Sequence, residues 1–178
     1  MELLKNYIPV SETEQRYKEK MLELYETKGE QAFNRSNLEA HFTASAWIVD
    51  PYSKEILLLH HKKLNKWLQP GGHADGETNL EAVARKEVKE ETALENLHLI
   101  RDEIFDIDIH LIPENKGIPQ HEHFDVRFAY FCNDIEKTQI NFESNDFHWI
   151  NLDKVESLTN EPSILRMKAK SKLLLNGI

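Results

Sequence analysis

The alternation of apolar and polar residues along the chain predicts strands of two kinds. Residues 41–50 (HFTASAWIVD) and 56–61 (ILLLHH) are apolar runs rich in β-branched and aromatic residues, with a turn signal between them. Runs of this kind are typical of strands that are covered on both faces. Residues 105–111 instead alternate strictly between apolar and polar side chains, which predicts a strand with one apolar and one polar face.

A second alternating strand is predicted at residues 121–130, and residues 113–120 make the connection, so we expect an antiparallel pair. Its polar face carries His121, His123, Asp125 and Arg127. Imidazole and guanidinium groups suit phosphate oxygens, so we expect His123 and Arg127 to bind substrate there. The alternative is an ordinary solvent-facing sheet surface. A zinc site made by these histidines is less favoured, because no cysteine or second histidine pair has ligand spacing.

Helical periodicity dominates the two ends of the chain. Residues 11–27 place apolar side chains at helical spacing, and Ser11 followed by Glu14 is a capping box. A short second helix is expected at residues 29–34, and further helices close the chain at residues 152–157 and 163–175. The apolar residues Ile164, Met167, Leu173 and Leu174 of the last helix are expected in the core. We therefore expect residues 1–40 to form an N-terminal helical extension packed on the same domain, and residues 41–178 to form the main domain. This extension is also a possible homodimer surface.

The most informative stretch runs from Trp67 to Leu94, where a short strand breaks at Pro70-Gly71-Gly72 and a loop leads into a helix. Near the end of this helix, Glu87, Glu90 and Glu91 stand at i, i+3 and i+4, so they share one face. The same face continues the apolar stripe of the helix, which predicts that the glutamates point inward. The alternative is a solvated acidic face.

Inward-facing carboxylates repel one another unless a cation meets them. Hard divalent cations such as Mg²⁺ prefer carboxylate oxygens and keep coordination positions open for substrate phosphates. The helix therefore predicts a site for Mg²⁺, with Mn²⁺ as a possible substitute, in which Glu87, Glu90 and Glu91 are the metal ligands.

These residues resemble the signature box of the Nudix hydrolases, which reads G, five residues, E, seven residues, R-E-U-x-E-E-x-G-U, where U is a bulky apolar residue. Here the pattern runs from Gly72 through Thr78 to the segment KEVKEETAL at residues 86–94. The resemblance implies a Nudix-like α/β/α sandwich with a mixed β-sheet over roughly residues 41–155. It also implies a metal-dependent hydrolase that cleaves a pyrophosphate linkage in a nucleoside diphosphate linked to another moiety.

The resemblance assigns roles residue by residue. Glu87, Glu90 and Glu91 would bind metal or activate water, Gly72 would shape the loop, and both Gly72 and Lys86 are expected at the substrate site. The segment NFESNDFHWINL at residues 141–152 resembles the late Nudix segment in which an acidic residue precedes a Trp-containing strand. Glu143 or Asp146 is therefore a candidate general base or further metal ligand, and we place Glu143 in the catalytic set.

Three positions depart from the family pattern, because Thr78 replaces the early Glu, Lys86 the Arg and Ala93 the Gly. These changes leave open a noncatalytic sensor that binds a nucleotide or sugar-phosphate on a Nudix scaffold. A less favoured alternative is an isoprenoid diphosphate isomerase, which relies on a catalytic cysteine. The single cysteine, Cys132, lies in an apolar run and is expected to be a buried core thiol.

Composition and net charge limit the classes of molecule that the protein is expected to bind. The chain has 178 residues and a net charge of -9, which argues against binding of nucleic acid polymers or anionic membranes and favours a small phosphorylated substrate. The sequence shows no long apolar span and no secretory leader, so we expect a cytoplasmic protein.

Overall fold

The computed structural model describes residues 1–115 and 117–175 and has the mixed α/β fold that the sequence predicts. The strands are β1 (Ala40–Val49), β2 (Glu55–His61), β3 (Lys66–Leu68), β4 (Gly71–His73), β5 (Leu97–Leu99), β6 (Asp106–Ile112), β7 (His121–Cys132) and β8 (Ser144–Asn151). The α-helices are α1 (Glu2–Asn6), α2 (Glu12–Lys28), α3 (Leu80–Thr92) and α4 (Pro162–Leu175). The 3₁₀ helices are η1 (Gly29–Phe33), η2 (Ile135–Lys137) and η3 (Leu152–Ser157).

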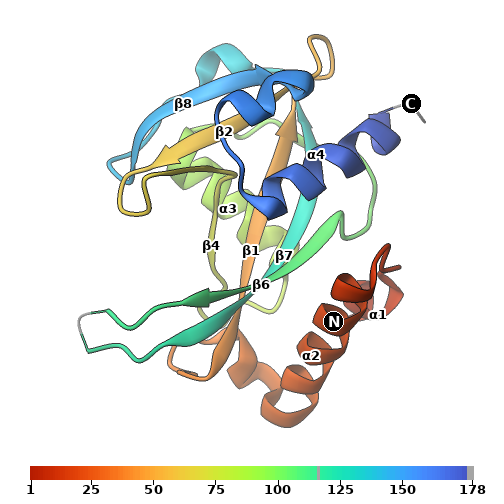
Figure 1. Cartoon of the computed structure of the whole chain (residues 1–178), viewed down its shortest axis with the longest axis vertical. Coiled ribbons are helices and arrows are strands. Elements are labelled where there is room, and N and C mark those ends of the chain that lie inside the picture. Colours follow the sequence, from red (N-terminus) through yellow and green to blue (C-terminus); the bar gives the residue numbers. More distant parts are fainter. Residues whose placement is uncertain (116, 176–178) are drawn as a thin grey trace. The chain divides into compact units, whose positions relative to one another are not determined.

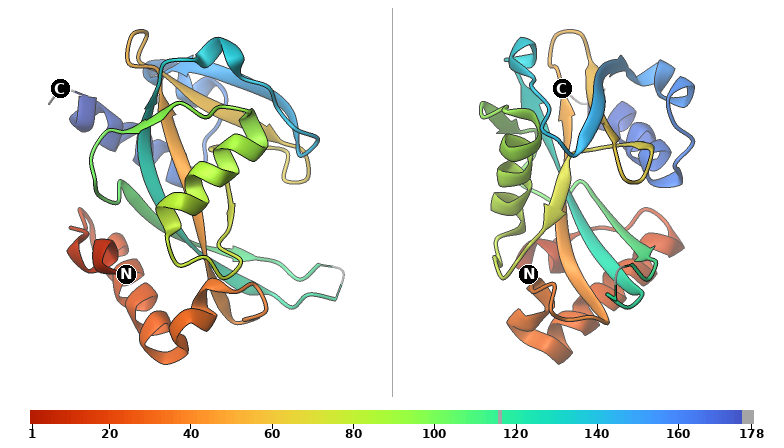
Figure 2. Two further views of the ribbon diagram at one scale, coloured as in Figure 1. Left: turned by 180° about the vertical axis from the view of Figure 1, so that it is seen from behind. Right: turned by 90° about the vertical axis from the view of Figure 1, so that its left-hand side faces the viewer.

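The strands form an eight-stranded sheet in which hydrogen-bonded neighbours follow the order β3-β2-β1-β7-β5. Outside this path, β4 pairs with β1, β6 with β7 and β8 with β2. The β6–β7 pair is antiparallel, as predicted, with Asp108 opposite Asp125 and His110 opposite His123. The two strands run as a long hairpin in the left view of Figure 2.

Internal contacts divide the chain into two compact units. The first unit comprises Met1–Ser45, Gly71–Lys86 and Arg101–Phe128, and the second comprises Ala46–Pro70, Glu87–Ile100 and Ala129–Ile178. Strands β1 and β7 and helix α3 each contribute residues to both units.

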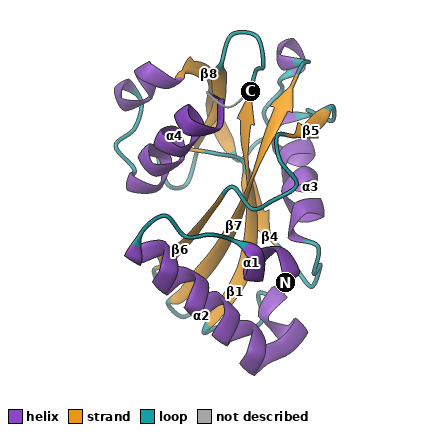
Figure 3. Cartoon of the chain, turned by 90° about the vertical axis from the view of Figure 1, so that its right-hand side faces the viewer, coloured by secondary structure: helices purple, strands orange, loops and turns teal. Residues whose placement is uncertain are grey.

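In the first unit, helix α2 packs against β6 and follows the short helix α1 (Figure 3). The Ser11 hydroxyl accepts a hydrogen bond from the Glu14 amide at 3.2 Å, as the capping box predicts. The Glu14 side chain does not complete the box, because its carboxylate is buried and accepts hydrogen bonds from the Tyr7 hydroxyl and the Val10 amide instead. Glu14 therefore ties the start of α2 to the preceding segment.

In the second unit, strand β2 lies between β3 and β8, and β8 is seen along β2 in Figure 1. Helix α4 packs against η3 and buries Ile164, Met167 and Leu174. Leu173 was also expected in the core, and this was wrong, since it is 76% exposed on the opposite side of the helix. Cys132 is fully buried, as expected. None of the helices described for residues 1–115 and 117–175 is long and apolar enough to span a membrane.

Candidate functional site

The loop before helix α3 is held by a close approach of two backbones. Strand β4 pairs antiparallel with β1, which places Gly71 opposite Ser45 and Gly72 opposite Ala44. A Cβ atom on Gly71 would lie 2.3 Å from the Ser45 Cβ, so only glycine fits at this position. This pairing fixes the loop that carries Gly72, while the predicted contact of Gly72 with substrate stays a prediction.

Helix α3 begins at a side-chain cap. The Asn79 carboxamide oxygen accepts a hydrogen bond from the Ala82 amide at 3.2 Å, and the Asn79 carbonyl accepts one from the Val83 amide at 3.1 Å. Asn79 follows directly after Thr78, the position where the family pattern has Glu. The helix start is thus formed without that glutamate.

The glutamates of α3 lie beside its buried side. Ala84, Val88 and Thr92 form one fully buried row, and the neighbouring row runs from buried Val83 through Glu87 to Glu91. Glu87 and Glu91 are half-buried, whereas Glu90 is exposed, so the prediction that all three point inward is wrong for Glu90. Figure 2 shows α3 as one continuous helix.

The C-terminal end of α3 has a strained residue, Ala93, at the position where the family pattern has glycine. Ala93 has a φ of 58°, in the left-handed region that favours glycine. Its amide donates to the Lys89 carbonyl at 3.0 Å, which closes the last turn of the helix. Alanine therefore keeps the helix end that glycine would form, at some conformational cost.

The segment before β8 is bound to this same end of the helix. The Asn141 side chain donates to the Glu90 carbonyl at 3.2 Å and its backbone amide donates to the Glu91 carbonyl at 3.3 Å. Two residues later, Glu143 is exposed, and its carbonyl accepts a hydrogen bond from the Lys62 amide at 2.8 Å. These contacts tie the segment of Glu143 to the backbone of the glutamate helix, while the catalytic role of Glu143 stays a prediction.

Asp146 lies within β8 opposite His60 and is exposed, and its side chain accepts a hydrogen bond from the next amide, that of Phe147, at 2.8 Å. Asp75 in the loop is paired with Arg35, whose guanidinium lowers the pKa of that carboxyl. The predicted substrate residue Lys86 is exposed and adds to this lowering of the Asp75 pKa. Asp75 therefore has a partner within the first unit.

Arg127 lies in a buried ion network. Its guanidinium contacts the carboxylates of Asp125 at 2.7 Å, Asp106 at 3.1 Å and Asp108 at 3.3 Å, and its side chain is 3% exposed. Burial alone would lower the pKa of Arg127, but the three carboxylates outweigh burial and raise it. This geometry supports a structural role for Arg127; the predicted contact with substrate phosphate stays a prediction.

Five histidines of the first unit form a contiguous cluster, and this cluster includes His123. The ring centroid of His123 lies 4.8 Å from that of His41, 4.8 Å from that of His73, 5.1 Å from that of His121 and 5.4 Å from that of His110. Burial, followed by the neighbouring histidines, lowers the pKa of His123 to about 2, and burial lowers that of His73 to about 4. These two imidazoles are therefore neutral at physiological pH.

His41 and His73 were not among the candidate residues from the sequence. Each is a single histidine in an otherwise ordinary strand or loop segment, so neither has a local spacing signal. They meet because β1 pairs with β4, with Thr43 opposite His73. Only the sheet register contains that information.

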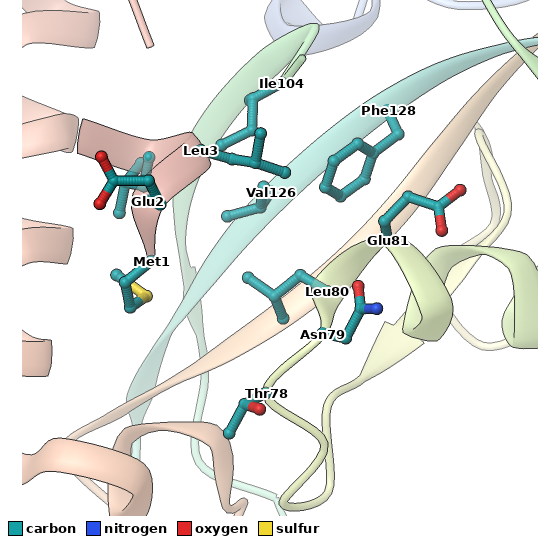
Figure 4. A pocket seen from close by; sticks show the side chains of 11 residues that line it. Met1, Glu2, Leu3, Thr78, Asn79, Leu80, Glu81, Ile104, Val126 and Phe128 are labelled. Atoms are coloured by element: carbon teal, nitrogen blue, oxygen red, sulfur yellow. The ribbon is translucent and has the colours of Figure 1, made fainter. Parts of the chain in front are cut away.

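A cavity of about 280 Å³ lies in the first unit beside the first turn of α3 (Figure 4). Its walls are mainly apolar, with Leu3, Leu80, Ile104, Val126 and Phe128 among them. Glu2 and Glu81 are its acidic lining residues. Since the walls do not include Glu87, Glu90 or Glu91, this cavity does not mark the predicted reaction centre.

The fold and the glutamate helix after a glycine-rich loop define a class of proteins, the Nudix-type hydrolases. The family description "NUDIX domain" matches residues 40–170, and the chain belongs to this family. A comparison with individually curated proteins returned no match at the required significance.

Solved structures agree on the fold. An Ap4A hydrolase from C. elegans, solved as a binary complex, is 20% identical, with a TM-score of 0.60 over 77% of this chain and 98% of that one. A Nudix-family hydrolase from Clostridium perfringens is 25% identical, with a TM-score of 0.55 over 75% and 97% of the two chains. The Nudix domain of NrtR from Shewanella oneidensis, complexed with ADP ribose, is 17% identical, with a TM-score of 0.54 over 75% and 87%.

Proposed function

We propose that this Nudix hydrolase uses a divalent cation, Mg²⁺ or Mn²⁺, to cleave a pyrophosphate linkage in a nucleoside diphosphate linked to another moiety. The observation that carries the proposal is the row on α3 that begins at buried Val83 and continues through half-buried Glu87 and Glu91. A row of carboxylates at the edge of a buried helix face fits a hard cation, because the carboxylate oxygens can bind the cation on one side while substrate phosphates bind it on the solvent side.

Glu87 and Glu91, together with Glu90 one turn after Glu87, would hold the cation. When bound, the cation supplies neutralisation of the charge that develops on the pyrophosphate oxygens. Glu143 would accept the proton of the attacking water, while the new oxygen–phosphorus bond forms and the anhydride bond breaks to release a nucleoside phosphate. The hydrogen bonds from Asn141 to the carbonyls of Glu90 and Glu91 hold the segment of this base on the helix.

The test is a panel of nucleoside triphosphates, nucleotide sugars, dinucleoside polyphosphates and diphosphoinositols, incubated with and without Mg²⁺ or Mn²⁺. We expect one class to release phosphate or nucleotide only with the metal. Glu87→Gln and Glu91→Gln should each reduce turnover by about 100-fold or more with an unchanged melting temperature. Glu95→Gln is the matched control, since Glu95 is an exposed residue paired with Lys89 on the surface. Full activity in either helix variant would overturn the metal role of α3.

A ligand sensor is the second candidate, and one comparison favours it, because the NrtR domain with the same fold was solved with ADP ribose. The sensor hypothesis predicts that one compound of the panel raises the melting temperature in the presence of Mg²⁺ without being cleaved. The departures Thr78, Lys86 and Ala93 would then explain the absence of turnover.

The isomerase alternative receives no support from the position of its required thiol. Cys132 is fully buried, and burial raises the pKa of its thiol, which disfavours the thiolate. Retained activity in Cys132→Ala would remove this alternative.

We expect the protein to act in the cytoplasm on a small phosphorylated substrate, without nucleic acid polymers or membranes as partners. The N-terminal helices remain our candidate homodimer surface. Analytical ultracentrifugation of the full chain beside a variant with charged substitutions on exposed residues of α2 tests this second point.

A further inference from the structure

The histidine cluster of the first unit contains three imidazoles whose nitrogens converge. Potential ligand atoms of His41, His121 and His123 all lie within 4.8 Å of one another, and His41 and His121 are buried. His41 comes from the start of β1, while His121 and His123 are the first and third residues of β7.

Hydrogen bonds fix which nitrogen of two rings points into the cluster. The Nδ1 atom of His41 lies 3.1 Å from the Asn37 carbonyl oxygen, and the Nδ1 atom of His121 lies 2.8 Å from the Pro119 carbonyl oxygen. A carbonyl can only accept, so each Nδ1 carries the proton and each Nε2 presents a lone pair. A backbone carbonyl that holds Nδ1–H is the usual partner that orients a metal-binding histidine.

The buried Nε2 atom of His41 has no hydrogen-bond partner among the described residues. An unsatisfied polar atom in the interior is costly, and a ligand that accepts its lone pair would remove that cost. The Nε2 atoms of His121 and His123 are 3.2 Å apart. Two nitrogens bound to one tetrahedral zinc at about 2.0–2.1 Å would be separated by roughly 3.3 Å, so this pair already has the required spacing.

We propose that His41, His121 and His123 bind one Zn²⁺ ion through their Nε2 atoms, at a site separate in its ligands from the glutamates of α3. Imidazole nitrogens suit zinc and do not suit Mg²⁺, which prefers oxygen ligands. The ring of His73 lies 5.2 Å from that of His41, beside this set of ligands, and a water molecule would complete the coordination of the ion.

The zinc ion would join the start of β1 to the start of β7. The sequence alone disfavoured zinc because no second histidine pair or cysteine with ligand spacing accompanies His121 and His123. The sheet instead brings in His41 as the third ligand, from 80 positions before His121. The proposal does not depend on the hydrolase activity, since its ligands and its readout are different.

The experiment measures zinc in the tag-free full-length protein. After chelator treatment, the protein is titrated with Zn²⁺ in excess Mg²⁺, and bound metal is counted by mass spectrometry. We expect one equivalent in the wild type, in Glu91→Gln and in His98→Gln, which alters an exposed histidine outside the cluster. His121→Gln should weaken zinc binding by about 100-fold or more.

X-ray absorption of the zinc-loaded wild type gives a readout that does not require a variant to fold. It should show a first shell of imidazole nitrogens at about 2.0 Å. The absence of stoichiometric zinc from the wild type, an oxygen first shell, or zinc lost in Glu91→Gln but kept in a folded His121→Gln would each overturn the proposal.

Discussion

Replacement of Arg127 by methionine should destabilise the protein strongly, because this side chain is the cation at the centre of a buried ion network. Methionine keeps most of the volume and removes the charge that contacts Asp106, Asp108 and Asp125. These residues are 0%, 8% and 3% exposed, so their carboxylates lose a partner where water compensates little. We expect a loss of about 3–5 kcal/mol, a large part of a typical stability of about 5–15 kcal/mol.

Urea denaturation measures this loss. Without the guanidinium, the three buried carboxylates lose the cation that offsets the cost of burying their charge. Arg101→Met is the control, since Arg101 forms an exposed pair with Glu103, and it should change stability by about 0.5 kcal/mol or less.

A loss in Arg127→Met below about 1 kcal/mol would refute the network as the reason for this residue. If the variant kept its stability and showed a raised KM for a phosphorylated substrate, the contact predicted from the sequence would be the better explanation.

The remaining predictions concern backbone and histidine positions. Ala93→Gly should stabilise the protein by up to about 1 kcal/mol in thermal denaturation, because glycine adopts the left-handed backbone without a Cβ penalty, and an unchanged or lower stability would contradict this. Gly71→Ala should cost about 1–3 kcal/mol through the clash with Ser45, and an equally stable variant would show that β1 and β4 are farther apart. In metal-free protein, the pKa values of His73 and His123 are lowered, so as pH falls the unfolded chain takes up protons before the folded protein does. The free energy of unfolding should therefore fall from about pH 6.5 towards pH 4, by at most about 1.4 kcal/mol per pH unit for each residue and by less where solvent reaches the ring. A free energy of unfolding that does not change with pH in urea titrations would contradict this.

Local patterns in the sequence were sufficient to predict most of the helices and strands of the fold. The capping signal at Ser11 marks the start of α2, and the strict alternation in residues 105–111 and 121–130 gives the β6–β7 pair. The regular spacing of apolar residues and glutamates in α3 places Glu87 and Glu91 beside its buried side. Each of these features depends on neighbours within a few residues, which is why it can be predicted from the sequence.

Features that depend on long-range register were not predictable. The polar face of β6 was open to a solvent-facing interpretation, yet Asp106 is fully buried because Arg127 lies opposite it in the register. The contact of His41 with His121 joins residues far apart in the chain. Leu173 was predicted in the core but is exposed, because a run of leucines at the end of a helix does not show which of them faces the core. Packing of α4 against η3 decides which side is buried.

The central claim is that the glutamates of α3 hold the cation for pyrophosphate hydrolysis. The most direct measurement is turnover of the best substrate of the panel, in H₂¹⁸O, by wild type, Glu91→Gln and Glu95→Gln at saturating Mg²⁺. We predict that the wild type and Glu95→Gln release a product with ¹⁸O on phosphate, and that Glu91→Gln loses about 100-fold or more of this rate while staying folded. Equal rates in the three proteins, or full turnover after Mg²⁺ is removed, would contradict the account.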